Sequence, residues 1–367
     1  MGKAIFERQW VGAPASTKSA DGLGPIFDAR ACSSCHAQGG AGIATMSNTG
    51  SLIGTGMILR LGNADPDARD PVYGRQLQLR ALQEQRAEAR AHLDWVARGS
   101  LRAPKLTLDD FGYGPLASGI AVSLRRAPSL KGIARIAEIP EADILAREDP
   151  DDRNHDGISG RANWITDKEG HRALGRFGWK ASEPTLAAQT ARALSRDMGL
   201  SSPLLPAPWG ECTEAEKACR AAPQGGTLED PEVSEELVDY VLDYLGALAP
   251  PARANDEDGR KAFAAIGCAG CHAGPVRSDL LLHDMGEGLA DGVAEDDASP
   301  SEWRTAPLLD VAASLKRGGL LHDARARSIE EAVGWHDGEA RAARLNYTHL
   351  SQNARAALDA YVLGETP

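Results

Sequence analysis

Two copies of one short motif contain the residues of this chain that are best suited to chemistry. The pattern C-x-x-C-H occupies residues 32–36 and 268–272. Two cysteines at this spacing lie on one side of a helical turn and can form thioethers to the vinyl groups of one porphyrin, and the next histidine then lies beneath the iron. The sequence therefore predicts two covalently bound c-type haems and redox chemistry, with these attachment and ligand residues: Cys32, Cys35, His36, Cys268, Cys271 and His272.

The alternatives for a C-x-x-C pair are a zinc site and a thioredoxin-like dithiol. A four-cysteine zinc site joins pairs that are about 15–20 residues apart. Here Cys35 and Cys268 are 233 positions apart (268 minus 35). A dithiol site would not need a histidine after both pairs, so the repeated motif favours haem.

Composition indicates a globular protein with an acidic surface. The hydrophobic content of 42% and charged content of 25% are ordinary for a soluble domain. No run of about 18 apolar residues is present, so we expect no transmembrane segment. The net charge of −12 disfavours nucleic acid and favours a redox partner or substrate with a basic face.

Two further cysteines, Cys212 and Cys219, lie outside the motifs in a stretch rich in proline and glycine. They predict a local disulfide in an oxidising compartment, with two free buried thiols as the alternative. Covalent haem attachment takes place outside the bacterial cytoplasm, so the motifs predict a periplasmic protein. Residues 1–4 lack the apolar region of a signal peptide, and we interpret the chain as one whose leader has been removed.

The chain is expected to be mainly α, with two cytochrome c-like haem domains and long loops. The N-terminal domain, residues 1–252, would contain large insertions, and the C-terminal domain, residues 253–367, would be compact. A stretch rich in Gln, Glu, Arg and Ala at about residues 75–98 resembles a helix, and no strand pattern dominates anywhere.

Three helices are predicted from apolar spacing and capping residues. Ser234 would cap a helix over 234–249, and a helix over 256–267 would lead into the second motif. The last helix, over 351–363, would pack against the helix at 256–267 and close the C-terminal domain.

A possible cation site is predicted by the pattern D-x-N-x-D-G at residues 152–157. The side chains of Asp152, Asn154 and Asp156 provide oxygen atoms at alternating positions, as in the first half of a calcium loop. The usual glutamate at the twelfth position is replaced by Asn163, so the loop is not an EF-hand. A plain turn rich in Asp and Asn is the alternative.

Several longer strings resemble the di-haem peroxidase superfamily, which includes bacterial cytochrome c peroxidases and MauG-type enzymes. In the C-terminal half these strings are Arg304–Leu308, Leu321–Asp323 and Ser328–His336. Further strings resemble most closely the di-haem "thiol oxidoreductase" branch of that superfamily, and these are Asp156–Arg161, Gly175–Ala181 and Ser278–Gly286. The resemblance extends from about residue 22 to residue 363.

The resemblance implies a division of labour between the two haems. The C-terminal haem would receive electrons, and the N-terminal haem would react with hydrogen peroxide. In relatives the sixth ligand of the C-terminal iron is Met or Tyr at a position that aligns with His336 here, which implies bis-histidine ligation. His283, Met285 and His322 are the competing ligands. The resemblance also implies a calcium ion between the haem domains.

The N-terminal haem has no obvious sixth ligand, and we expect its iron to be open or bound to water. Met46 and Met57 are the nearest candidate ligands in the sequence. Breaking the O–O bond of peroxide also requires an acid–base group. By position relative to Arg126–Pro128 the first candidate is Glu138, followed by Glu141. Gln76 and Arg126 are the further candidates. Both glutamates could instead be charges at a helix start, because Pro140 and Glu141 are typical of one.

Electron transfer between the haems could use Trp164 or Trp179, which lie between the two motifs; core packing is the alternative for each. The sequence favours a periplasmic di-haem oxidoreductase that uses hydrogen peroxide, either as a peroxidase supplied by a small redox protein or as a MauG-like oxidase. The alternatives are a di-haem electron-transfer cytochrome without catalysis and a haem-linked accessory protein.

Overall fold

The structure is a computed structural model that describes residues 1–17, 19–44, 51–167, 169–254 and 256–365. Among these residues no helix is both long and apolar enough to cross a membrane. The part of the chain before the predicted domain boundary contains, in order, α1 (Gly2–Phe6), β1 (Ile26–Phe27), α2 (Cys32–Cys35), η1 (Ala37–Gly39), β2 (Ser51–Leu52), β3 (Met57–Gly62), β4 (Gln76–Leu77), β5 (Arg80–Ala81), β6 (Arg90–Arg98), β7 (Leu101–Asp109), β8 (Ala121–Arg126), α3 (Ala134–Ala137), α4 (Glu141–Leu145), β9 (Trp164–Thr166), β10 (Arg172–Leu174), α5 (Leu186–Met198), α6 (Lys217–Arg220) and α7 (Glu235–Ala247).

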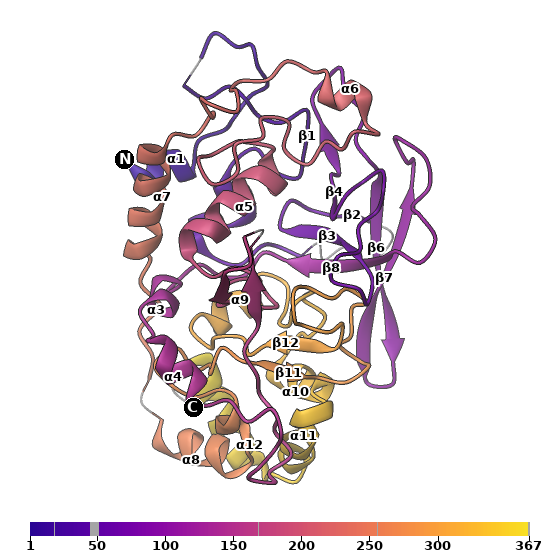
Figure 1. The fold of residues 1–367 in the computed structure, drawn as a ribbon. Coiled ribbons are helices and arrows are strands. Elements are labelled where there is room, and N and C mark those ends of the chain that lie inside the picture. The colour runs from indigo at the N-terminus through magenta and orange to yellow at the C-terminus, as the bar shows by residue number, and fades with distance from the viewer. Residues whose placement is uncertain (18, 45–50, 168, 255, 366–367) are drawn as a thin grey trace.

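The rest of the chain forms a smaller unit, coloured orange to yellow in Figure 1. The predicted boundary after residue 252 lies between α7 and the first helix of this unit. Its elements are α8 (Glu257–Ala265), η2 (Cys268–Gly270), β11 (Leu282–Asp284), β12 (Glu302–Arg304), α9 (Val311–Lys316), α10 (Ile329–Trp335), η3 (Gly338–Ala340), α11 (Arg341–Thr348) and α12 (Gln352–Leu363).

The expectation of a mainly α fold is wrong. The structure is 28% helix and 17% strand, and the strands form several small sheets. The segment at 75–98, predicted as a helix, contains β4, β5 and β6 instead. Its Ala, Gln and Glu residues favour a helix by propensity, but Ala91 and Leu93 alternate with more exposed residues and pair with β7, and this burial overrides propensity.

Strand β3 separates the N-terminal core from the interior cavity. It pairs antiparallel with β4 and with β8, in the order β4-β3-β8. Met57, Leu59 and Leu61 face one side and are buried in a hydrophobic cluster. Ile58 and Arg60, on the other side of the strand, line the cavity described below.

Two helices with capped N-termini, α5 and α7, pack against each other (Figure 1). The Thr185 side chain accepts a hydrogen bond from the Ala188 N–H at the start of α5, and Gly199 ends that helix with φ of 65°. Ser234 caps α7 in the same way, as the sequence predicts, by accepting from the Leu237 N–H. Both helices pack into a cluster that also contacts Cys32.

The C-terminal unit is built around α8 and α12, the two helices predicted to pack together. Ser351 caps α12, and the rings of Phe263 and Tyr361 join the two helices with centroids 5.4 Å apart. Phe263 and Leu358 lie in the same buried cluster. This packing fixes α8, which leads directly into the second motif.

The long β6–β7 hairpin connects the two units. Figure 1 shows it extending from the N-terminal unit to α10. Arg102 on β7 donates hydrogen bonds from Nε to the Arg325 carbonyl (2.9 Å) and from Nη2 to the Ala324 carbonyl (3.2 Å). Leu101 lies against Gly334 of α10. The hairpin therefore contacts the helix that ends just before His336.

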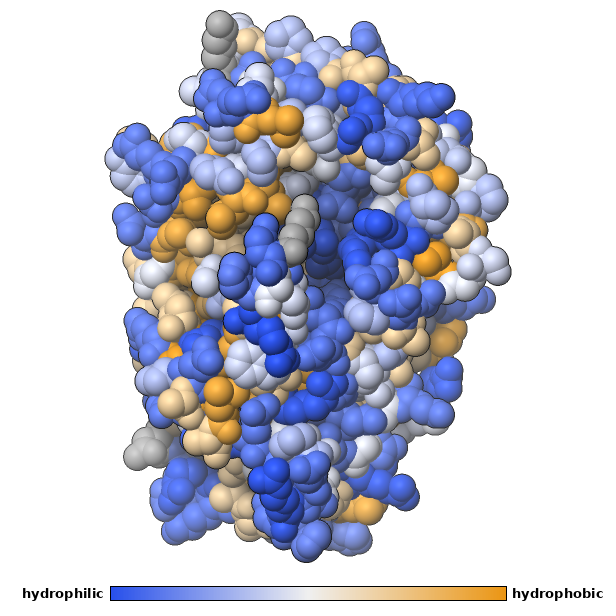
Figure 2. Space-filling model, in the orientation of Figure 1, coloured by the Kyte–Doolittle hydropathy of each residue, from blue (hydrophilic) through white to orange (hydrophobic). Residues whose placement is uncertain are grey.

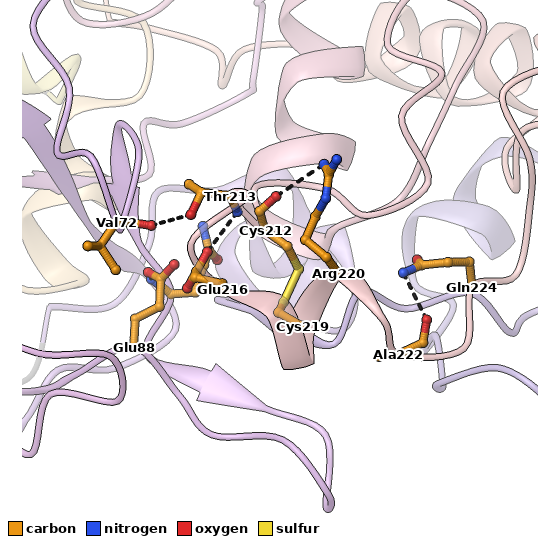
Figure 3. Close-up of a disulfide and its surroundings, with 10 residues drawn as sticks. Val72, Glu88, Cys212, Thr213, Glu216, Cys219, Arg220, Ala222 and Gln224 are labelled. Carbon is orange, nitrogen blue, oxygen red and sulfur yellow. Dashed lines mark hydrogen bonds between the residues drawn. A yellow bond between two sulfur atoms is a disulfide. The ribbon is translucent and has the colours of Figure 1, made fainter.

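Cys212 and Cys219 form a disulfide next to a buried pair of glutamates (Figure 3). Glu216 lies between the two cysteines in the sequence, and its Oε2 accepts from the Thr213 N–H at 2.8 Å. Burial and the charge of Glu216 raise the pKa of Glu88 well above its usual value. The disulfide thus closes the loop that brings these two carboxyl groups together.

Candidate haem sites

Both C-x-x-C-H motifs line one interior cavity of about 740 Å³. Cys32, Cys35 and His36 line one part of it, and Cys268, Cys271 and His272 line another. None of these four cysteines is in a disulfide. The thiols are therefore free to form thioethers, and a single cavity that contains both motifs fits two porphyrins on one chain.

The N-terminal haem site is formed by α2 and the residue that follows it. Burial raises the pKa of Cys32 to about 12, and Cys35 donates from Sγ to the Thr55 carbonyl at 2.6 Å. Burial lowers the pKa of His36 to about 4, although the backbone of Gly40 and Pro128 opposes the shift. His36 Nδ1 is buried without a hydrogen-bond partner. The histidine is thus neutral, the form that binds iron.

Polar side chains from α5 form a wall of the N-terminal site. Gln189, Ala193 and Asp197 line the cavity at four-residue spacing, which puts them on one face of the helix. Glu183, just before α5, also lines the cavity and forms an ion pair with Arg192. Burial raises the pKa of Glu183, while Arg192 acts in the opposite direction. Figure 2 shows a hollow with hydrophilic residues around it over the region between α5 and β3.

Gln76, an acid–base candidate from the sequence, bridges two buried carboxyl groups at this site. Its Nε2 donates to Asp28 at 3.0 Å and to Asp197 at 2.8 Å. Arg60 donates from Nη1 to Gln76 Oε1 at 3.2 Å. Burial and the charge of Asp197 raise the pKa of Asp28 to about 7. Gln76 is therefore in the network behind the cavity wall, and Arg60 and Asp197 are the members of this network that line the cavity itself.

The other three candidates have different surroundings. Arg126 lines the cavity, but its guanidinium binds the carbonyls of Gly42, Ser314 and Gly319, which ties together the two units of the fold. Glu138 and Glu141 are exposed and do not line the cavity. Glu141 is the first residue of α4, the helix that the Pro–Glu pair predicts.

Neither methionine suggested for the N-terminal iron lines the cavity among the described residues. Met57 is fully buried in the core on the other side of β3. Met46 lies outside the described residues. Met198, at the end of α5, does line the cavity and packs with Trp10 and Leu194 in a hydrophobic cluster.

The C-terminal haem site has two partly buried histidines with matching hydrogen bonds. His272 Nδ1 donates to the Arg277 carbonyl at 3.3 Å, and His336 Nδ1 donates to the Ala332 carbonyl at 2.7 Å. In each ring this leaves Nε2 as the nitrogen with a free lone pair. Burial lowers the pKa of both, that of His272 to about 4 with a further contribution from His336. The two rings are thus near neighbours that line one cavity.

Apolar side chains dominate the surroundings of these two histidines. Leu308, just before α9, and residues of α8, α9, α10 and α12 line this part of the cavity. The helix residues include Phe263, Val311, Ile329, Val333, Leu358 and Val362. Most of them belong to the buried core of the C-terminal unit.

The three competing ligands for the C-terminal iron also line the cavity. Both ring nitrogens of His283 contact carboxylates, Asp279 at 2.9 Å and Glu339 at 2.6 Å. The ring of His322 stacks on Trp303, with centroids 3.9 Å apart and planes 10° apart. Met285 is in the strand-to-loop segment after β11.

Aromatic rings lie along the cavity between the two sites. Trp179 makes an edge contact with His322 at 6.5 Å, and its Nε1 donates to the Arg126 carbonyl at 2.7 Å. Trp303 is flanked by the ammonium of Lys180, 4.2 Å from the ring centroid, and by Arg125 at 5.4 Å. Trp164 does not line the cavity; it packs against a separate hydrophobic cluster.

The D-x-N-x-D-G loop is exposed and satisfies its own oxygen atoms. Asp152 accepts from the Gly157 N–H, Asn154 from the Asp156 N–H, and Asp156 from the Ile158 N–H. The last two are the hydrogen bonds of successive Asx turns, and the first closes the loop over five residues. Calcium binding by this loop stays a prediction.

Sequence reasoning missed Glu183, Gln189 and Asp197. The search for an acid–base group began from the position of Arg126 and led to Glu138 and Glu141, which are exposed and do not line the cavity. The Gly175–Ala181 string ends two residues before Glu183. Thr185 as an N-cap and polar residues at 189 and 197 could have identified a helix with a polar face.

A family model described as "Di-haem oxidoreductase, putative peroxidase" matches residues 116–278 and 274–364. Together these matches cover more than half of the chain. The chain belongs to this family of di-haem oxidoreductases. The match includes the second motif and His336, whereas the first motif precedes it. Comparisons with curated proteins and with solved structures gave no significant match.

Proposed function

We propose that this di-haem oxidoreductase is a periplasmic peroxidase that reduces hydrogen peroxide with electrons from a small redox protein. The observation that supports it is the difference between the two parts of the cavity. The C-terminal site has two histidines in an apolar setting, and the N-terminal site has one histidine and a polar wall. Covalently bound haem would supply an iron that exchanges electrons at both sites and, where one position is open, binds peroxide.

At the C-terminal site His272 and His336 would be the two axial ligands. Each donates its Nδ1–H to a backbone carbonyl, which fixes the tautomer and orients Nε2. The apolar residues around them exclude water. Two imidazole ligands favour a low reduction potential relative to a histidine–methionine pair. This site would therefore accept electrons from the donor and pass them on.

At the N-terminal site Glu183 would move the protons that reduction of peroxide requires. It is buried on the cavity wall, and its pKa is raised by burial, so it can hold a proton near neutral pH more readily than an exposed glutamate. Arg192 keeps the carboxyl group in place. Gln189, on the same wall, can donate a hydrogen bond to peroxide. The balanced reaction takes two electrons and two protons per peroxide and gives two waters.

Electrons would pass between the sites through Trp179 and His322. Both rings line the cavity and contact each other. Trp303 stacks on His322 but has the charges of Lys180 and Arg125 beside it, which disfavour loss of an electron from its ring. Trp164 packs in the core away from the cavity and is not part of this route.

The cellular location and the donor follow from the same chemistry. Covalent haem attachment and the Cys212–Cys219 disulfide both suit an oxidising compartment. The net charge of −12 favours a donor with a basic face. The Asp152–Asp156 loop remains a candidate calcium site. Elemental analysis and exhaustive chelation test it: finding no calcium in the protein, together with haem spectra and thermal stability that chelation leaves unchanged, would exclude calcium.

The deciding experiment is low-temperature EPR of the ferric protein, alone and as His336→Ala. We expect one low-spin and one high-spin signal, and conversion of the low-spin signal to high-spin in the variant. Consumption of peroxide with a reduced donor should accompany the open iron. Two low-spin signals and no reaction with peroxide in either redox state would instead indicate an electron-transfer cytochrome, with Met198 as the ligand to test.

A further inference from the structure

His283 is a buried histidine whose two ring nitrogens both face carboxylates. It lies on β11 and is 3% exposed. Nε2 is 2.9 Å from Asp279 Oδ2, and Nδ1 is 2.6 Å from Glu339 Oε2. A neutral imidazole has one N–H and could donate to only one of them. Burial acts against the charged form, but the hydrogen bonds of both carboxylates and of Cys271 raise the pKa of His283 to about 12.

Glu339 connects this histidine to the chain that follows His336. It is three residues beyond His336, in η3. Besides His283, its carboxylate accepts from the Ser159 N–H at 2.9 Å, from Ser159 Oγ at 3.1 Å and from the Asp284 N–H at 2.9 Å. One carboxylate thus fastens the segment after His336 to β11 and to the segment at residue 159.

On its other side His283 contacts the second haem attachment motif. Cys271 Sγ is 3.7 Å from His283 Nδ1. The ring packs closely against the backbone of Gly160, where an added Cβ atom would lie only 2.6 Å from His283 Cε1. One side chain therefore contacts the residue just before His272 and, through Glu339, the segment just after His336.

A metal ion is the competing interpretation of this cluster. Ligand atoms of Cys271, Asp279 and His283 lie within 4.8 Å of one another. Two observations disfavour it. Both nitrogens of His283 are used by carboxylates, and thioether formation at Cys271 would remove the thiolate that a metal requires.

We propose that His283 is a positioning residue for the C-terminal haem site, which it acts on by joining Asp279 and Glu339 so that His336 stays opposite His272. This group of three residues is called the His283 clamp. The inference rests on the proposed axial role of His336. The Asp279–His283–Glu339 interaction joins two chain segments, and Glu339 adds the segment at Ser159. Loss of the central cation leaves the buried Asp279 and the partly buried Glu339 without a positive partner. The segment after His336 would then move, and His336 would dissociate.

The test compares His283→Gln with the unchanged protein, both with haem attached. Gln cannot donate to both carboxylates from two separate nitrogens. We expect EPR at neutral pH to show at least about a tenfold rise in the high-spin fraction of the C-terminal site, equivalent to about 1.4 kcal/mol of ligand binding. The signal of the N-terminal site should not change. Glu339→Gln should also raise the high-spin fraction of the C-terminal site, by a smaller factor. If His283→Gln does not fold, Glu339→Gln is the variant to test.

A matched control separates positioning from general loss of stability. Tyr347→Phe removes a buried hydrogen bond to Asp359, 2.9 Å long, from the same unit without touching the clamp. It should lower the thermal midpoint and leave both EPR signals as they are. An unchanged low-spin signal in His283→Gln and Glu339→Gln would overturn the inference if His336→Ala does become high-spin. A low-spin signal in His336→Ala would instead show that the axial assignment itself has failed.

Discussion

The two haem sites share one cavity and one attachment motif but differ in what surrounds the histidine. The N-terminal site is next to Glu183, Gln189 and Asp197, and the C-terminal site is next to apolar helices and a second histidine, His336. A polar wall can move protons, whereas an apolar wall with two imidazoles can hold an electron without rearrangement. The comparison shows how one short motif can serve two roles, because the residues that decide reactivity are distant from it in the sequence.

The largest effect that we expect from the difference between the two sites is that each haem can be removed without loss of the other. Cys32→Ser with Cys35→Ser should reduce haem content from two per chain to one and remove the high-spin signal. Cys268→Ser with Cys271→Ser should remove the low-spin signal instead. The pyridine haemochrome assay and EPR measure both. Cys212→Ser with Cys219→Ser is the control, because it deletes two cysteines outside the cavity and should leave haem content at two.

Glu183 gives the next largest effect and should act only at the N-terminal site. Glu183→Gln keeps the shape of the side chain but removes its proton chemistry. The rate of the reaction with peroxide should fall by about 10²- to 10⁴-fold, the usual contribution of an acid–base group, with the low-spin signal unchanged. Stopped-flow spectroscopy measures the rate. Glu138→Gln is the matched control, because Glu138 is exposed outside the cavity. A loss of rate in that variant alone would reverse the assignment.

Glu138 and Glu183 also show where sequence reasoning ends. Glu138 is the unusual polar residue among Ile136, Ala137 and Ile139, and that local pattern favours a buried functional group. In the structure Ile136 is buried and Glu138 faces solvent, because the short helix α3 turns only one side inward. A pattern of neighbouring residues identifies a change of polarity, but it cannot tell which cavity a side chain faces.

The same difference between local and long-range information explains which parts of the fold the sequence predicts. Spacing within a motif or a helix is local, so the sequence predicts α7, α8 and α12. The closeness of His336 to the second motif, 64 positions away (336 minus 272), is implied only by the family resemblance. The β4-β3-β8 sheet joins Leu59 to Leu124, 65 positions apart (124 minus 59). No short window contains that pairing. Composition and local spacing therefore did not predict the strands, and they did not predict that β3 forms part of the cavity wall.

Replacing the ring proposed to connect the two sites should have a smaller effect. Trp179→Phe should slow electron transfer between the haems by about tenfold, or about 1.4 kcal/mol in activation free energy, because the edge contact with His322 is lost. Trp164→Phe is the control, since Trp164 lies in a separate core cluster. Flash reduction followed by optical spectroscopy resolves the transfer. Equal slowing in both variants would mean that the aromatic rings act through packing alone.

The last prediction concerns stability rather than reactivity and is a pH dependence that belongs to the N-terminal site. Burial and Asp197 raise the pKa of Asp28 from 3.8 to about 7. The folded protein therefore keeps a proton that the unfolded chain releases between about pH 4 and pH 7. Because the folded state binds more protons in this range, stability must fall as pH rises through it, by up to about 4 kcal/mol for a shift of three units.

Asp28→Asn mimics the protonated form and should remove this slope. The Leu79 N–H, which donates to Asp28 Oδ1 at 3.1 Å, would still have an oxygen to bind. We expect the free energy of unfolding of the variant to change less between pH 5 and pH 8 than that of the unchanged protein, as measured by denaturant titration. Asp239→Asn, exposed on α7, should keep the full slope. If the slope survives in Asp28→Asn, another buried acid of the N-terminal site is its source, and Asp197, which Gln76 joins to Asp28, is the next residue to change.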